Sequence, residues 1–219
     1  RSSKKHENRW TKFPWNRRCR EAEHRQFFFA IFEISFKARA SPTKMIPRVI
    51  YRTWSSEMLP PPFMSAWNFT QSQNPTFKQI LFTDADMEEF MHVEYGRRAP
   101  WGDAVLRAFK RINPIYGAAR ADLFRYALIY VRGGIYMDIK SASRDMSTIL
   151  HRNDRMLLSH WPEHSIVRFW SRMHLRKSVG EYQQWWLAAA CGHPAMEKVI
   201  NITIDNIMNH KSYDGDETI

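Results

Sequence analysis

Residues 118–140 read AARADLFRYALIYVRGGIYMDIK, and this stretch decides the architecture of the chain. It predicts a helix over about residues 114–131, because apolar residues recur at helical spacing and the pair Gly133-Gly134 then stops the helix. Residues 135–139 predict a short apolar strand directly after it. Helical and strand-like segments that alternate along a chain are typical of a layered α/β fold.

Charged side chains on this helix and strand predict a binding site. At 100° per residue, Asp122 and Arg125 share one helix face, whereas Arg120 lies off it and is a weaker candidate. Alternation along the strand points Asp138 and Lys140 to one face. The carboxyl end of a strand in an α/β sheet is where ligands bind. Two carboxylates and a guanidinium suit a ligand with hydroxyl and phosphate groups, so we expect Asp122, Arg125 and Asp138 to meet in one cleft.

Plainer interpretations of the same residues stay open. Asp122 and Arg125 could form a solvated ion pair worth a few tenths of a kcal/mol. Asp138 could cap the loop that follows its strand. Trp54, at the end of an earlier strand, could be an ordinary core residue, and His193 before a proline fits a structural role at a helix start better than that of a catalytic base.

The rest of the chain continues the alternation of strands and helices from residue 46 onward. A capping pair, Thr83 and Asp86, precedes one helix, and Gly96 follows it. We expect strands at 46–51, 77–82, 135–139 and about 156–159, and helices of about 12 residues from Pro60, then at 86–95, 103–112, 114–131 and from Pro194 onward. Residues 182–190 are apolar and rich in tryptophan.

Composition separates a basic arm, residues 1–45, from one α/β domain, residues 46–219. The chain of 219 residues has a formal charge of +11, of which residues 1–40 carry +7. Such an arm suits anionic lipid, acidic polymer or nucleic acid, or serves solubility. The domain has no recognisable nucleic-acid-binding module, which makes nucleic-acid binding a remote alternative. Cys19 and Cys191 lack the spacing of a zinc site or a disulfide framework.

The arm contains the most apolar run of the chain, Phe27–Phe32. It is far shorter than the roughly 20 residues that a membrane-spanning helix needs. We expect a core helix, a strand, or an amphipathic element on a membrane surface, so membrane association through the N-terminal region stays open.

Five blocks of sequence, in order between about residues 46 and 200, resemble a known family. They are Ile46–Trp54, Asn74-Pro75 with Thr83-Asp84, Ala119–Tyr126, Gly133–Asp138 and Gly192-His193-Pro194. The blocks resemble glycosyltransferase family 32, whose sugar-binding region contains a DXD motif and which includes relatives of the fungal initiating α-1,6-mannosyltransferase and of the clostridial glucosylating toxins. The resemblance implies a GT-A fold, which is α/β and Rossmann-like, with a mixed central sheet flanked by helices.

The resemblance also implies roles for individual residues in a nucleotide-sugar site. Trp54 would stack on the nucleotide base, since aromatic stacking tolerates any base. Asp122 and Arg125 would bind donor sugar hydroxyls, with Arg125 also reaching the diphosphate, and Asp138 would contact the ribose or a metal-bound water. Thr53, Tyr136 and Gly134 complete the donor-binding set, and Asp122, Arg125, Asp138 and Lys140 form the catalytic set.

Lys140 departs from the family, which usually carries there a second Asp that ligates Mn²⁺ or Mg²⁺. We expect one of three consequences. Lys140 supplies positive charge to the diphosphate and makes transfer metal-independent, or the metal stays on Asp138 and other residues, or catalysis is lost and nucleotide-sugar binding remains. Trp185 also replaces a family Asn, for which Gln183 or Gln184 could substitute.

The function implied is retaining transfer of a hexose from a UDP- or GDP-sugar to a glycan or protein acceptor. Relatives are commonly type II proteins of the Golgi or endomembrane lumen, so we expect that compartment here. Relatives also carry a Thr-Gly-Pro block after the last helix, and we expect the domain to be C-terminally truncated in this sequence.

Overall fold

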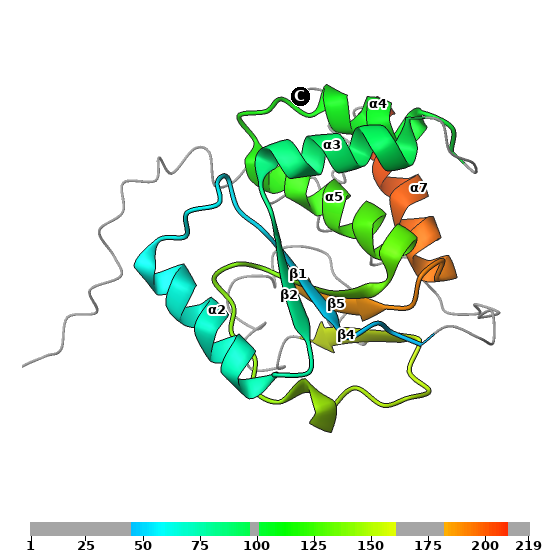
Figure 1. The fold of residues 1–219 in the computed structure, drawn as a ribbon. Coiled ribbons are helices and arrows are strands. Elements are labelled where there is room, and N and C mark those ends of the chain that lie inside the picture. The colour runs from blue at the N-terminus through cyan, green and yellow to red at the C-terminus, as the bar shows by residue number, and fades with distance from the viewer. Residues whose placement is uncertain (1–44, 97–100, 161–181, 210–219) are drawn as a thin grey trace, which may run out of the picture.

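The structure, a computed structural model, describes residues 45–96, 101–160 and 182–209 (Figure 1). The basic arm, Cys19, the run Phe27–Phe32 and residues 210–219 lie outside the described residues. The elements are β1 (Val49–Thr53), α2 (Pro61–Gln73), β2 (Lys78–Phe82), α3 (Asp84–Tyr95), α4 (Ala104–Arg111), α5 (Gly117–Arg132), β3 (Gly134–Met137), the short 3₁₀ helix η2 (Met146–Thr148), β4 (Met156–His160), β5 (Tyr182–Ala189) and α7 (Pro194–Asn209).

The five described strands form one mixed sheet in the order β2-β1-β3-β5-β4. Strands β2, β1 and β3 are parallel, whereas β5 runs antiparallel to both β3 and β4. Figure 1 shows α2 on one side of the sheet and α3, α4, α5 and α7 on the other. This mixed sheet between two helical layers confirms the α/β fold predicted from the sequence.

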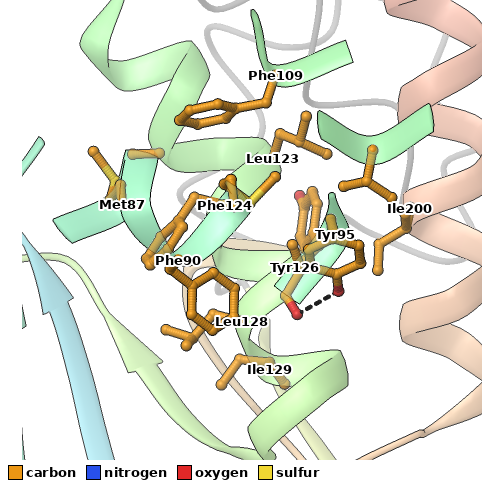
Figure 2. Close-up of a cluster of buried hydrophobic side chains, with 14 of the residues drawn as sticks. Met87, Phe90, Tyr95, Phe109, Leu123, Phe124, Tyr126, Leu128, Ile129 and Ile200 are labelled. Carbon is orange, nitrogen blue, oxygen red and sulfur yellow. Dashed lines mark hydrogen bonds between the residues drawn. The ribbon is translucent and has the colours of Figure 1, made fainter. Parts of the chain in front are cut away.

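The main core lies between the sheet and α5. Helix α5 buries Leu123, Phe124 and Leu128 completely, and Figure 2 shows them among side chains of the surrounding helices. The rings of Phe90 and Phe124 meet edge-to-face with centroids 5.4 Å apart. A ring pair of this geometry adds about 0.5–1.5 kcal/mol beyond the burial of its area. This packing against the core fixes the direction of the helix face that carries Asp122 and Arg125.

Most predicted boundaries hold within a few residues, and the caps are as predicted. The Thr83 hydroxyl accepts a hydrogen bond from the Asp86 amide, and the Asp86 side chain accepts one from the Thr83 amide. Gly133 and Gly134 both have positive φ, at 64° and 109°. A Cβ at Gly133 would lie 2.7 Å from a backbone nitrogen, so this sharp entry into β3 requires glycine.

Between β1 and β3 the connections of the sheet change direction. The two strands are parallel neighbours, with Tyr51 opposite Tyr136. The chain leaves β1 toward α2 on one side of the sheet and reaches β3 through α5 on the other (Figure 1). Carboxyl ends of strands at such a reversal of direction are where open α/β sheets bind ligands. Thr53 and Asp138 mark these two ends.

Candidate functional site

Asp122, Arg125 and Asp138 meet at the carboxyl end of β3. One Arg125 amino group, Nη2, lies 2.6 Å from Asp122 Oδ1 and 3.5 Å from Asp138 Oδ1. The side chains of Asp122 and Asp138 are 16% and 24% exposed, whereas that of Arg125 is 6% exposed. The predicted convergence is therefore present, with both carboxylates at the surface and the guanidinium behind them.

The Arg125 guanidinium is engaged on every side. Its Nη1 donates to the backbone oxygen of Gln184 at 2.6 Å, and its Nε donates to that of Ala121 at 3.4 Å. Its Cζ lies 4.5 Å from the centroid of the Tyr136 ring. This geometry favours a role in orienting the carboxylates over direct contact with a diphosphate, because most of the donors already have partners.

Electrostatics stabilise the charged form of Arg125. Burial acts to lower its pKa, but the nearby carboxylates of Asp122 and Asp138, together with Tyr136, raise it above its ordinary value. Burial raises the pKa of both Tyr126 and Tyr136, and the positive charge of Arg125 offsets only part of that rise. The site therefore holds a permanent cation beside two neutral phenols.

Thr53 and Trp54, at the end of β1, lie on opposite faces of the sheet. Thr53 Oγ1 and the Tyr136 hydroxyl share a hydrogen bond of 2.9 Å, which links β1 to the ring beneath Arg125. The half-buried ring of Trp54 meets Phe63 of α2 edge-on, with centroids 4.8 Å apart. Trp54 is therefore at the carboxyl edge of the sheet, and stacking on a base stays a prediction.

Lys140 does not continue the strand as predicted. Strand β3 ends at Met137 rather than at residue 139. The Ser141 amide donates to the Asp138 carbonyl at 2.9 Å, which closes a four-residue turn. Alternation along a strand therefore cannot place Lys140. Its side chain is exposed, two residues beyond Asp138, and its role toward a ligand stays a prediction.

Gly134 lies apart from the charged residues of the predicted site. It begins β3, four residues before Asp138, and at about 3.3 Å per residue this places it roughly 13 Å away. A Cβ there would lie 2.9 Å from the Tyr51 ring and 3.0 Å from the Val49 carbonyl. Close backbone packing therefore explains why glycine stands here, at the amino end of β3.

Other candidate side chains have structural partners. Arg120 packs over the Phe109 ring at 4.2 Å, on the far side of α5 from the site. Gln184 Oε1 accepts from the Tyr126 hydroxyl at 2.8 Å, and Gln183 Oε1 accepts from Ser159 at 2.6 Å. His193 Nδ1 accepts from the Ala195 amide at 3.2 Å, and burial lowers the pKa of His193. These contacts agree with its expected structural role at the start of α7.

Sequence reasoning missed a buried arginine on the other face of the sheet. Arg52 of β1 has no exposed surface. Its Nη1 donates to the backbone oxygens of Ile139 and Ser141 at 3.2 and 2.9 Å, and its Nη2 donates to the Thr70 hydroxyl at 2.9 Å. The signal was an arginine inside an apolar strand, at a position that faces α2.

The described residues offer a poor set of ligands for a divalent cation. Within residues 45–96, 101–160 and 182–209, no group of three or more His, Cys, Asp or Glu side chains could hold a metal. One oxygen of Asp138 already faces Arg125, and the family's second acidic position is Lys140. Mg²⁺ in such sites is commonly held by one or two carboxylates together with substrate phosphates.

The chain is similar to known proteins. Residues 60–156, which include Asp122, Arg125 and Asp138, match the model of the family described as glycosyltransferase sugar-binding region containing DXD motif. The chain is 30% identical over 107 residues to inositol phosphoceramide mannosyltransferase 3 of Schizosaccharomyces pombe, covering 48% of this chain and 28% of that protein. It is 23% identical over 193 residues to the initiation-specific alpha-1,6-mannosyltransferase of Candida albicans, covering 82% and 48%.

A solved structure resembles the fold. The PaToxG glycosyltransferase aligns with a TM-score of 0.58 at 12% identity, covering 90% of this chain and 71% of that chain. At this identity the likeness supports the GT-A fold alone. The chain spans less than half the length of the curated relatives named above. Residues 60–156 therefore resemble the glycosyltransferase family whose sugar-binding region contains a DXD motif, and the chain has the fold of a solved glycosyltransferase.

Proposed function

We propose that this chain carries the donor site of a retaining glycosyltransferase, which moves a hexose from a nucleotide diphosphate sugar to a glycan or protein acceptor. One observation carries the proposal: Arg125 joins Asp122 and Asp138 at 2.6 and 3.5 Å at the carboxyl end of β3. Mannose is the first sugar to test, because the curated relatives are named mannosyltransferases. Donors that carry uracil and donors that carry guanine both belong in the test.

The two carboxylates suit hydroxyl recognition. Each keeps part of its surface open while Arg125 holds it from behind. A carboxylate that is fixed in this way accepts hydrogen bonds from sugar hydroxyls without the entropy loss of a free side chain. Trp54 at the end of β1 would supply the face on which the base stacks.

The reaction needs charge stabilisation more than a nucleophile. The bond between the anomeric carbon and the diphosphate oxygen breaks, and the acceptor oxygen bonds that carbon on the same face. The acceptor proton passes to the leaving diphosphate. The exposed Lys140 ammonium, in the turn directly after Asp138, is our candidate for stabilising the negative charge that develops.

A divalent cation fits these residues poorly. Asp138 is engaged by Arg125, and the ammonium of Lys140 would repel a cation at the neighbouring position. We therefore derive no step through a metal ion. Transfer independent of Mn²⁺ and Mg²⁺ is the form of the reaction that we propose.

The test is nucleotide-sugar binding and turnover across a panel of UDP- and GDP-hexoses, with Mn²⁺ or with EDTA. We expect binding of at least one donor in EDTA. Lys140→Met should weaken that binding by about 10- to 150-fold, since a charge-assisted hydrogen bond contributes about 1.5–3 kcal/mol. Lys78→Met is the matched control, because Lys78 is exposed at the amino end of β2. A folded protein that binds no member of the panel overturns the proposal.

A second variant pair tests the carboxylates. Asp138→Asn should abolish turnover and weaken donor binding, because an amide cannot replace the charge that Arg125 orients. Asp154→Asn is the control, because Asp154 lies in a turn just before β4. The first residue of β4 pairs with Ala189, which pairs with Gly134 at the amino end of β3, away from Asp138. Equal donor affinity in both variants would exclude Asp138 from the site.

The position of Lys140 also favours a second candidate, a relative that binds nucleotide sugar without transferring it. This candidate predicts donor affinity with no hydrolysis or transfer in any metal. Lys140→Asp, which rebuilds the acidic pair of the family, should then create a Mn²⁺-dependent turnover. Robust turnover by the unchanged protein excludes this candidate.

Placement in the Golgi or endomembrane lumen, and membrane association through the N-terminal region, follow from the family resemblance and stay proposals. Among the described residues, no helix combines the length and the apolar character needed to cross a membrane.

A further inference from the structure

We infer that Arg52 is a positioning residue of the donor site, which holds the turn 138–141 in the shape that presents Asp138 and Lys140 together. The expected effect on donor binding rests on the proposed function. The hydrogen bonds between Arg52 and the turn do not depend on it. Arg52 lies in β1, on the face of the sheet covered by α2. Arg125 holds the Asp138 carboxylate from the opposite face.

Arg52 grips the backbone of the turn on both sides of Lys140. Its Nη1 donates to the carbonyls of Ile139 and Ser141, the residues before and after Lys140. A single planar guanidinium therefore sets the orientation of two peptide groups. The Asp138 amide is held independently, because it donates to the Trp185 carbonyl of β5 at 2.9 Å. With three of its peptide groups fixed, the turn leaves Lys140 only the freedom of its side chain.

Helix α2 extends the same clamp along the chain. The Thr70 hydroxyl accepts from Arg52 Nη2 at 2.9 Å and from the Ser143 amide at 3.2 Å. Asn74 Nδ2 donates to the Arg144 carbonyl at 3.0 Å, and Asn74 Oδ1 accepts from the Met146 amide at 2.7 Å. Residues 139–146 contain no strand or α-helix residue. Side chains of β1 and α2 hold this segment in place instead.

Burying a charge here is costly, which argues for a role beyond filling space. Arg52 is completely buried, and the hydrogen bonds found for it among the described residues go to uncharged oxygens. Burial lowers the pKa of Arg52 to about 10, and Tyr136 and Asp138 act against that shift. A methionine of similar volume would avoid the desolvation cost. A guanidinium, unlike methionine or lysine, reaches two carbonyls and a hydroxyl at once.

The expected consequence is loss of preorganisation of the site. When the turn is free to move, the donor must order Asp138 and Lys140 at the moment of binding, and a misplacement of about 1 Å at a reacting centre can cost up to 100-fold in rate. The loss should therefore appear in donor affinity as well as in turnover.

The experiment compares Arg52→Lys with Arg48→Lys in the full chain. Both changes keep the charge, and Arg48 is a matched control because it is exposed just before β1 and its side chain donates a hydrogen bond to Thr76 rather than to the turn 138–141. Thr70→Ala is a milder second variant that removes one acceptor of Arg52 and keeps the arginine. For each protein, hydrogen exchange of residues 138–146, the thermal midpoint, donor KM and kcat are measured.

We expect Arg52→Lys to speed exchange in residues 138–146 and to raise donor KM about tenfold, with Thr70→Ala intermediate and Arg48→Lys unchanged. The effects of Arg52→Lys and Lys140→Met should be non-additive, because both act through one turn. A purely structural role would reduce the active fraction, which lowers apparent kcat and leaves KM unchanged. That result, or exchange equal to that of Arg48→Lys, overturns the inference.

The two proposals fail in distinguishable ways. If the unchanged protein binds no nucleotide sugar, the proposed function fails, and the exchange measurement still decides whether Arg52 clamps the turn. If donors bind and the Arg52 and Thr70 variants match the control in both exchange and KM, the clamp fails and the function stands.

Discussion

The two faces of the sheet each bury an arginine beneath the same turn, but in opposite surroundings. Arg125, on the α5 face, is paired with two carboxylates, which raise its pKa. Arg52, on the α2 face, donates to two backbone carbonyls and a hydroxyl, and burial lowers its pKa. One guanidinium therefore balances the charge of acidic side chains, and the other shapes the backbone that carries them.

This difference indicates how the site divides its requirements. A carboxylate that binds sugar hydroxyls must stay ionised and aimed, which a directly bonded cation provides. A turn that presents an exposed ammonium must hold its backbone still, which multiple donors from one rigid group provide. The charged side chains around the turn are positive on balance. They are the cations Arg52, Arg125 and Lys140 and the carboxylates Asp122 and Asp138. The balance suits an anionic diphosphate.

The largest expected effect comes from removing the charge-balancing arginine. Arg125→Met leaves Asp122 and Asp138 beside each other without their cation, and breaking a buried pair in this way costs about 3–5 kcal/mol. Because both carboxylates keep some exposure, we expect a value of about 3 kcal/mol. Urea unfolding followed by tryptophan fluorescence measures the free energy of unfolding.

Two further variants complete this comparison. Arg52→Met should destabilise the protein less than Arg125→Met, because it leaves unpaired neutral oxygens at about 1–3 kcal/mol rather than unpaired charges. Arg132→Met is the control for loss of an exposed arginine on the same helix, α5. If Arg52→Met costs as much as Arg125→Met, the proposed division between charge balance and backbone support is wrong.

An intermediate effect separates the two tyrosines near Arg125. The Tyr126 hydroxyl donates to buried Gln184 Oε1, so Tyr126→Phe strands an acceptor and should cost about 1–3 kcal/mol. The Tyr136 hydroxyl bonds Thr53, which is only half-buried and can turn to water, so Tyr136→Phe should cost about 0.5–1.5 kcal/mol. Thermal unfolding of the two variants side by side measures the order, and the reverse order would contradict this account.

The α5 half of this comparison was predictable from sequence, and the α2 half was not. Asp122 and Arg125 lie one helical turn apart, and the strand follows at once, so local periodicity sufficed to bring them near Asp138. The support from Arg52, Thr70 and residues 139–146 depends on bonds between residues 18 to 89 positions apart. No local pattern specifies such contacts.

The prediction that the strand extends to residue 139 was wrong for a related reason. Alternation predicts side-chain direction only while the strand lasts, and apolar Ile139 made the strand look longer than it is. The turn that ends β3 is closed locally by the Ser141 amide and the Asp138 carbonyl, but it is also held by Arg52, a tertiary contact that no local pattern specifies. The glycine pair was read correctly as a helix stop. Its second member, Gly134, stays a predicted donor contact, because a tight backbone contact and a ligand contact leave the same signature in sequence.

The smallest expected effect is a pH dependence of the free energy of unfolding to which neither arginine contributes. The two guanidinium groups stay charged throughout neutral and mildly acidic pH, so His193 is the group to follow there. Burial lowers the pKa of His193 from its ordinary value of 6.5, and its Nδ1 accepts from the Ala195 amide only when neutral. The unfolded chain takes up a proton near pH 6.5, whereas the folded chain does so only at lower pH. The stability that neutral His193 contributes is therefore present above pH 6.5 and is lost as pH falls below it.

Unfolding midpoints at pH 7.5, 6.5 and 5.5 should decline more steeply for the unchanged protein than for His193→Asn, which keeps an oxygen to accept from the Ala195 amide. Parallel declines would show that neutral His193 does not contribute to the loss of stability between pH 7.5 and 5.5.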